Sequence, residues 1–238
     1  MRACWHITGA SRGLGKALAE CVLGQEDTMV YGYARHQSIF HERYVHRDTD
    51  LSVVATLESF QFDKDITCEQ IVLVNNAGTL GQIAFAGNID FDQMTSAYHT
   101  NILAVHALSN AFIRAYHQVE AKKVIINITS GAAQNAYAGW SIYCATKAAM
   151  DMLTKCLRAE MAGVANPFYT YAIAPGIMDT EMQAVIRQAD ETQFPRKEKF
   201  IELHATGKLI PVEQVAQAYF QFVEHCNGIE EPIQKIAL

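Results

Sequence analysis

The sequence has no long run of basic residues and only a modest net charge. Its 19 Lys and Arg residues are outnumbered by 25 Asp and Glu residues, which gives a formal net charge of −6. A nucleic-acid partner would require clustered cations that neutralise phosphates. We therefore expect no nucleic-acid binding.

Long apolar runs and a secretory leader are also missing. No stretch approaches the ~18 consecutive apolar residues that indicate a membrane span. The residues after Met1 show no basic region followed by an apolar region and a small-residue cleavage site. The six cysteines include no C-x-x-C pair, so neither zinc nor a disulfide framework is indicated. We expect a cytoplasmic protein with reduced, mostly buried thiols, no metal and no membrane association.

Internal repeats and low-complexity linkers that would divide the chain are absent as well. Half of the residues are hydrophobic and 18% are charged, which is typical of a soluble globular protein. A length of 238 residues is enough for one sizeable core. We therefore predict a single domain over residues 1–238.

Short apolar runs bounded by turn residues alternate with longer segments whose apolar residues recur every three or four positions. This alternation indicates βαβ units around a parallel sheet. Strands are predicted at residues 4–8, 29–34, 71–75, 123–129, 168–174 and 233–237, with a weaker one near Tyr44. Helices are predicted at residues 14–23, 53–60, 91–118, 142–161 and 212–224. The predicted fold is α/β, a Rossmann-type doubly wound parallel sheet of about seven strands with helices on both faces.

The least regular portion of the chain is residues 178–209. Met182, Phe194 and Phe200 stand there among many charged residues. This mixture favours a mobile amphipathic segment that covers a site; a surface loop packed on the body of the protein is the alternative. We expect Met178, Met182 and Phe194 to contact a substrate with an aromatic or planar apolar portion.

A glycine-rich turn follows the first predicted strand and opens the first predicted helix. Thr8-Gly9-Ala10-Ser11-Arg12-Gly13-Leu14-Gly15 has the spacing G-x-x-x-G-x-G, which differs from the G-x-G-x-x-G of many dinucleotide-binding proteins. Glycines let a pyrophosphate approach the amino terminus of the helix, where free N–H groups favour anions. This context predicts nucleotide binding; a plain tight strand-to-helix turn is the alternative.

The residues after the second predicted strand bear on the choice of cofactor. In a doubly wound sheet this strand end faces the adenine ribose, where an acidic residue suits NAD and an arginine suits the 2′-phosphate of NADP. The residue here is Arg35, and Arg12 in the glycine turn could grip the same phosphate. NADP is therefore favoured over NAD, the alternative being that both arginines are ordinary solvated charges. Asp50 could accept a hydrogen bond from the adenine amino group or could cap a helix.

Tyr143 and Lys147 are four residues apart and so share one face of a predicted helix. Tyrosine has an unperturbed pKa of about 10, so it is a poor acid–base catalyst at neutral pH unless a positive charge stabilises its phenolate. Lys147 would provide that charge. The same spacing also occurs by chance in many helices, where it joins a core tyrosine to a surface lysine.

Together with other motifs, this pair makes the sequence resemble the short-chain dehydrogenase/reductase family over nearly the whole chain. The glycine turn is one signature, and Asn75-Asn76-Ala77-Gly78 is another. Ser130 lies thirteen residues before Tyr143, as the family's active-site serine does. Asn101 matches the family's helix asparagine, and Pro175-Gly176 through Thr180 matches the Pro-Gly-x-x-x-Thr turn.

The resemblance implies an NADP(H)-dependent oxidoreductase with defined residue roles. Ser130 would hydrogen-bond the substrate carbonyl oxygen, Tyr143 would donate a proton to the nascent alkoxide, and Lys147 would bind the nicotinamide ribose while lowering the tyrosine pKa. Asn101 would hold a water that links the lysine to solvent, and Thr180 would contact the nicotinamide carboxamide. The further cofactor-binding residues would be Gly9, Ser11, Arg12, Gly13, Leu14, Gly15, Arg35, Asp50, Asn76, Ala77, Gly78, Pro175, Gly176 and Ile177.

The expected activity is the NADPH-dependent reduction of a bulky ketone or dicarbonyl, aromatic or pterin-like, to an alcohol. Residues 179–183 and 207–211 look like the corresponding segment of sepiapterin reductases and bacterial benzil reductases. The alternatives are a 3-oxoacyl thioester reductase, an NADP-dependent alcohol or sugar dehydrogenase, and a catalytically silent NADP(H)-binding sensor or scaffold. Family members commonly pair through the tyrosine-bearing helix, so we expect a homodimer or homotetramer; small residues there would allow close approach, namely Ala145, Ala148 and Ala149.

Overall fold

The computed structural model describes residues 1–64 and 67–238. At its centre lies a seven-stranded sheet in the order β3-β2-β1-β4-β5-β6-β7, in which all neighbouring strands run parallel. The strands are β1 (Ala3–Thr8), β2 (Thr28–Ala34), β3 (Tyr44–Asp48), β4 (Gln70–Asn75), β5 (Lys122–Ile128), β6 (Phe168–Ala174) and β7 (Ile233–Lys235). The predicted α/β fold with about seven strands is confirmed.

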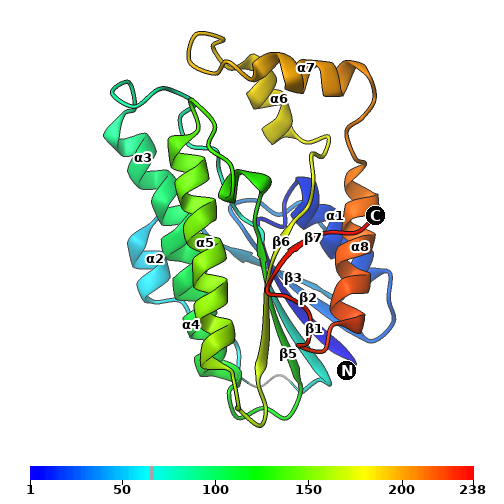
Figure 1. The fold of residues 1–238 in the computed structure, drawn as a ribbon. Helices are drawn as coiled ribbons and strands as arrows, with labels where there is room; N and C mark the ends of the chain where they lie inside the picture. The colour runs from blue at the N-terminus through cyan, green and yellow to red at the C-terminus, as the bar shows by residue number, and fades with distance from the viewer. Residues whose placement is uncertain (65–66) are drawn as a thin grey trace.

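Helices cover both faces of the sheet (Figure 1). On one face α1 (Gly13–Leu23) packs beside α8 (Val212–His225). The opposite face carries α2 (Val54–Glu58), α4 (Ala104–Tyr116) and α5 (Ser141–Glu160). Because both faces are covered, the inner strands are hydrophobic at successive positions, and every residue of β1 and β4 is buried.

One buried polar residue of β1 is satisfied within the core. The His6 imidazole lies 2.9 Å from the Tyr33 hydroxyl through Nδ1 and 3.3 Å from the Tyr116 hydroxyl through Nε2. Burial lowers the pKa of His6 to about 3. This histidine is therefore a neutral, hydrogen-bonded core residue.

The predicted helix over residues 91–118 is divided in three. A π-helical stretch, η1 (His99–Leu103), separates α3 (Phe91–Tyr98) from α4. Sequence periodicity does not reveal a π turn, because it shifts the register by a single residue. The predicted helix at 53–60 is also shorter, since α2 has five residues.

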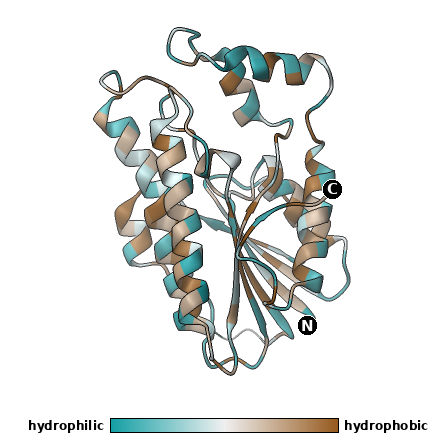
Figure 2. Ribbon diagram, viewed as in Figure 1, coloured by the Kyte–Doolittle hydropathy of each residue, from teal (hydrophilic) through white to brown (hydrophobic). Residues whose placement is uncertain are grey.

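Residues 178–209 contain more regular structure than the sequence suggested. They form α6 (Glu181–Gln188) and α7 (Lys197–Ala205), which lie beyond the carboxyl ends of the strands (Figure 1). Figure 2 shows scattered hydrophobic residues among hydrophilic ones on both helices. The Thr180 hydroxyl caps α6 by accepting a hydrogen bond from Gln183 N at 3.4 Å. We call this unit the α6–α7 segment. Within the described residues, no helix is both long and apolar enough to cross a bilayer.

Candidate active site

The glycine turn joins β1 to the start of α1. Gly9 and Gly13 have positive φ angles of 65° and 52°, the left-handed conformation that favours glycine. A Cβ on Gly9 would lie 2.9 Å from Asn76 Nδ2, and one on Gly15 would overlap both Asn76 Nδ2 and Gly9 O. No side chain caps the amino terminus of α1 at Arg12. A narrow backbone cradle therefore meets uncapped N–H groups, an arrangement that fits a pyrophosphate.

The turn is tied to the end of β4 through Thr8. The Thr8 hydroxyl accepts hydrogen bonds from Asn76 N at 2.9 Å and from Ala77 N at 3.0 Å. The Asn76 side chain donates in return to Thr8 O at 2.9 Å. The structure thus brings two sequence motifs, the glycine turn and residues 75–78, side by side.

The three residues predicted to bind the adenosine end of the cofactor lie at the surface or near it. Arg35 is exposed just after β2. Arg12 is also exposed, and its guanidinium forms an ion pair with Glu181 in the first turn of α6. Asp50 accepts hydrogen bonds from Ser52 N at 2.9 Å and Ser52 Oγ at 2.7 Å, which lowers the pKa of its carboxyl, as the charge of Arg35 also does. The N-cap position of α2 is Val53, not Asp50, so Asp50 closes the turn before α2 instead of capping the helix.

Asn101 lies within the π-helical stretch η1 and is fully buried. Its Oδ1 accepts a hydrogen bond from Thr79 N at 2.9 Å, and its Nδ2 donates to Thr79 O at 2.8 Å and to Thr146 Oγ1 at 3.0 Å. The π turn therefore directs this amide towards α5 and the loop after β4.

Ser130 follows β5 and begins the short 3₁₀ helix η2 (Gly131–Ala133). Its hydroxyl accepts a hydrogen bond from Ala132 N at 3.2 Å. Burial raises the pKa of Tyr143 on α5, and the Ser130 hydroxyl opposes that shift. Without a further stabilising charge, the phenol stays protonated at neutral pH.

Lys147 reaches the same place from one turn further along α5. Its ammonium donates to Ile128 O at 2.7 Å and lies 5.7 Å from the centre of the Tyr143 ring. Burial lowers the pKa of Lys147 to about 8, and the carboxylate of Asp151 acts in the opposite direction. Gly78 leaves room here, because a Cβ on it would lie 3.7 Å from Lys147 Nζ.

The turn after β6 lies beside the glycine turn. Gly176 has a φ of 84°, and a Cβ on it would lie 2.7 Å from Ile210 Cδ1. Ile177 O accepts a hydrogen bond from Ile210 N at 3.0 Å. The methyl group of Thr180 would lie 3.8 Å from a Cβ on Gly13. The Pro-Gly-x-x-x-Thr motif is therefore brought to the glycine turn.

The family model for short chain dehydrogenases matches residues 4–191. The chain belongs to the short chain dehydrogenase family. It is therefore an oxidoreductase, of a family whose enzymes use nicotinamide cofactors.

Individual relatives of this short chain dehydrogenase span most of its length. Benzil reductase ((S)-benzoin forming) of Bacillus subtilis is 35% identical over 225 residues, covering 92% of each chain. Sepiapterin reductase of Mus musculus is 29% identical over 233 residues, covering 89% of this chain and 87% of its own. Among solved structures, the closed form of serine dehydrogenase complexed with NADP+ has a TM-score of 0.78 at 21% identity, over 98% of this chain and 94% of that one. The last similarity concerns the fold.

A group of aromatic rings beside Tyr143 was not predicted from the sequence. The Trp140 ring, at the start of α5, lies 5.5 Å from the Tyr143 ring and stacks on Phe194 at 4.7 Å. Phe200 of α7 lies 5.5 Å from the same indole. The one signal in the sequence for these ring contacts was the tryptophan just before the helix with Tyr143 and Lys147. In this short chain dehydrogenase, the ring stack fastens the α6–α7 segment over the site.

Two of the three predicted substrate contacts need correction. Phe194 is fully buried in the ring stack, so it is an anchor and offers no surface to a substrate. Met178 pairs with Ile210 in an isolated bridge and packs against the core between the sheet and α1 and α8. Met182 is partly buried against the cluster containing Tyr143, and its contact with a substrate stays a prediction.

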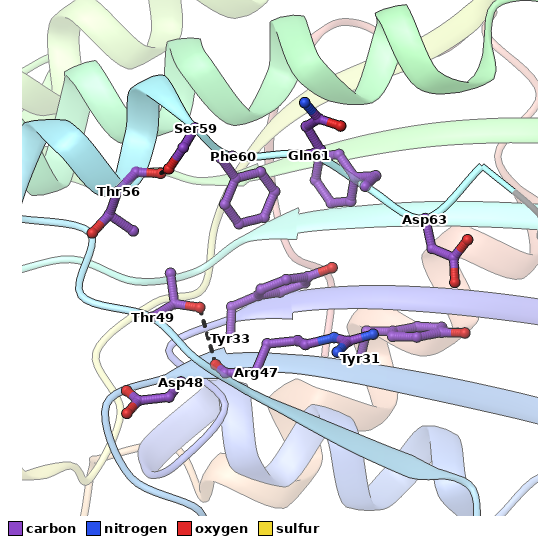
Figure 3. A pocket seen from close by; sticks show the side chains of 11 residues that line it. Tyr31, Tyr33, Arg47, Asp48, Thr49, Thr56, Ser59, Phe60, Gln61 and Asp63 are labelled. Atoms are coloured by element: carbon purple, nitrogen blue, oxygen red, sulfur yellow. Dashed lines mark hydrogen bonds between the residues drawn. The ribbon is translucent and has the colours of Figure 1, made fainter.

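A separate pocket of about 450 Å³ lies at the β2–β3 edge of the sheet (Figure 3). Tyr33 and Phe60 form part of its wall, with ring centres 5.2 Å apart, and Arg47 extends along it. None of the predicted site residues lines it. It is therefore distinct from the site around Ser130, Tyr143 and Lys147. In the part of the chain that is described, no group of three or more His, Cys, Asp or Glu side chains could hold a metal ion.

Proposed function

We propose that the chain is an NADPH-dependent carbonyl reductase that converts a bulky ketone or dicarbonyl, aromatic or pterin-like, to an alcohol. The observation that carries this proposal is the cluster of half-buried Ser130 with buried Tyr143 and Lys147, and with Asn101 behind it. The names of the benzil reductase and sepiapterin reductase relatives support a carbonyl substrate.

The residues of the cluster have complementary tasks. Bound NADPH would supply the hydride to the carbonyl carbon. Ser130 would donate a hydrogen bond to the carbonyl oxygen, and Tyr143 would release its phenolic proton to that oxygen as it becomes an alkoxide. The Lys147 ammonium would stabilise the phenolate that remains. Asn101 Oδ1 accepts one protein hydrogen bond, which leaves a lone pair that can hold a water for return of the proton.

The cofactor would bind along the carboxyl ends of the strands. The cradle at Gly9, Gly13 and Gly15 fits the pyrophosphate, and Lys147 would hold the nicotinamide ribose. Exposed Arg35 would bind the 2′-phosphate. Arg12 would join it by leaving Glu181, an exchange of one exposed ion pair for another that costs little. Asp50 keeps an oxygen that Ser52 does not occupy, which supports its predicted hydrogen bond with the adenine.

The remaining predicted cofactor contacts surround the same cleft. Ser11, Leu14, Asn76, Ala77, Gly78, Pro175, Gly176, Ile177 and Thr180 belong to the three motifs that the structure brings together. Thr180 would contact the nicotinamide; its motif follows β6, which pairs with the strand before Ser130.

The surroundings of Tyr143 support an aromatic or planar substrate. The apolar cluster around Tyr143 contains Leu80, Trp140 and Ile186, which are buried, and Met182, which is only partly buried and could still meet a substrate. Apolar surroundings of this kind favour apolar carbonyl compounds over small charged ketoacids. The α6–α7 segment would cover the substrate and exclude water during proton transfer.

Exposed small residues on α5 support self-association. Ala145, Ala148 and Ala149 face solvent in the single chain, so a second copy can approach α5 closely. A homodimer or homotetramer acting in the cytoplasm follows from this proposal.

The proposal is tested by combining a substrate panel with Tyr143→Phe. Pterins, aromatic diketones, quinones and acyl thioesters are mixed with NADPH, and the absorbance of NADPH is followed. Reduction of an aromatic diketone or a pterin is expected, and Tyr143→Phe should lower kcat by about 10²- to 10⁴-fold because positioned acid catalysis is lost. Fluorescence titration should show nearly unchanged NADPH affinity. Residual activity above about a tenth of wild type would contradict the role of Tyr143.

A further inference from the structure

Asp151 is a buried carboxylate that the proposed function does not use. It lies on α5, one helical turn after Lys147, and is 8% exposed. Its Oδ1 accepts a hydrogen bond from Thr129 Oγ1 at 2.5 Å. Burying a carboxylate is costly, so its place behind the active site calls for a physical reason.

The partners of Asp151 and Lys147 are neighbours at the end of β5. Lys147 donates to Ile128 O at 2.7 Å, whereas Asp151 accepts from Thr129, the residue before Ser130. Two successive turns of α5 therefore hold two successive residues of the strand end. These two hydrogen bonds hold the end of β5 against α5 and so set the position of Ser130 relative to Tyr143.

The charge of Asp151 also favours an arrangement in which Lys147 is ionised. Lys147 is strongly desolvated, and the carboxylate of Asp151 favours its charged form by raising the pKa that burial lowers. Burial raises the pKa of Asp151 itself; the hydrogen bond from Thr129 and the charges of Lys155 and Lys147 oppose this. In the described parts of the chain, Asp151 is the only charged group that alters the pKa of Lys147, and the centre of the Tyr143 ring lies 5.7 Å from the ammonium.

We propose that Asp151 is a positioning residue that keeps the Lys147 ammonium charged and, through Thr129, holds Ser130 against α5. This inference rests on the proposed function only in what the charged ammonium is used for. Asp151 touches neither substrate nor cofactor in this account; it acts through Lys147 and Thr129.

The test compares variants that separate charge from shape. Asp151→Asn keeps the size of the side chain and an oxygen for Thr129 but removes the charge. Asp151→Glu keeps the charge and displaces the oxygen. Glu160→Gln, at an exposed position on the same helix, removes an equal charge about 13 Å further along α5 and is the matched control. Asp151→Ser provides a second neutral variant if Asp151→Asn does not fold.

The first readout needs no turnover. Competitive acetylation with acetic anhydride across a pH series, followed by peptide mass spectrometry, gives the ionisation midpoint of Lys147 in the free protein. In Asp151→Asn this midpoint should fall by about one pH unit, a tenfold change in the ionisation constant. In Glu160→Gln and Asp151→Glu the midpoint of Lys147 should stay within about 0.3 pH unit of the wild-type value, because the first removes only a distant, screened charge and the second keeps the charge.

The second readout is the pH profile of kcat/KM for NADPH-dependent reduction. Its alkaline limb should move to lower pH in Asp151→Asn by the same amount as the midpoint, and Asp151→Glu should restore the limb. An unmoved midpoint, or a kcat that falls equally at every pH, would overturn the proposal, because either result indicates a purely structural carboxylate. A shifted midpoint in a protein that reduces no carbonyl would uphold the role of Asp151 and refute the proposed function.

Discussion

The alanine variant of Gly15 tests whether the cradle between β1 and β4 is as tight as the structure indicates. A Cβ at this position would overlap Asn76 Nδ2 and Gly9 O. The Asn76 amide donates to Thr8 O at 2.9 Å and to Gly9 O at 3.3 Å. The variant must therefore displace the hydrogen bonds that join the glycine turn to β4.

Three contributions determine the size of the effect. Overpacking of a tight site costs about 1–3 kcal/mol, and each displaced hydrogen bond costs about 1 kcal/mol. Alanine regains up to about 1 kcal/mol as a better helix former than glycine. We expect the free energy of unfolding of Gly15→Ala to fall by about 2–4 kcal/mol, and the Kd for NADPH to rise at least about tenfold because the cradle is distorted.

Urea unfolding monitored by tryptophan fluorescence and titration with NADPH measure the two quantities. Gly131→Ala is the matched control, since nothing lies within 4 Å of a Cβ there and its φ is outside the left-handed region. The control should unfold at an equal or slightly higher urea concentration. If Gly15→Ala lost less than about 0.5 kcal/mol, within the range of ordinary surface substitutions, the reasoning would be refuted.

Two further predictions concern cofactor choice and pH. Arg35→Ala should weaken NADPH by about ten- to 150-fold and barely affect NADH, and Arg35→Asp should reverse the preference; the ratio of kcat/KM for the two cofactors measures this. A wild type that prefers NADH would show that Arg35 is only a solvated charge. Carbonyl reduction should decline as pH rises through about 8, because Lys147 loses its proton there while burial keeps the Tyr143 phenol protonated. The measurement is kcat/KM as a function of pH. If kcat/KM stayed level up to about pH 10, where lysine and tyrosine ordinarily titrate, this assignment would be contradicted.

The strands and most helices were predictable because their signals are local. An all-buried strand such as β4 reads as a continuous apolar run, and the helix with Tyr143 and Lys147 shows clear periodicity. The cluster of Ser130, Tyr143 and Lys147 was also accessible, since its residues occur in motifs with fixed spacing. The order of the strands then brings those motifs to one edge of the sheet.

Features that depend on tertiary contacts were not accessible in the same way. The π turn that carries Asn101 leaves no periodic signature. Phe194 looked like a substrate contact because an aromatic residue among charges has the same pattern whether it faces a ligand or another ring. The pairing of Arg12 with Glu181 joins residues 169 positions apart, and Asp151 gave no motif at all.

The α6–α7 segment is attached through aromatic rings, because Trp140 stacks on Phe194 and contacts Phe200 at a tilted angle. This attachment depends on a few side chains. Met182 is only partly buried against the same cluster, so it is the position to vary in a mutant library that changes the surroundings of Tyr143. Ile186 and Trp140 are buried in the cluster, so a library that changed either residue would loosen the α6–α7 segment itself.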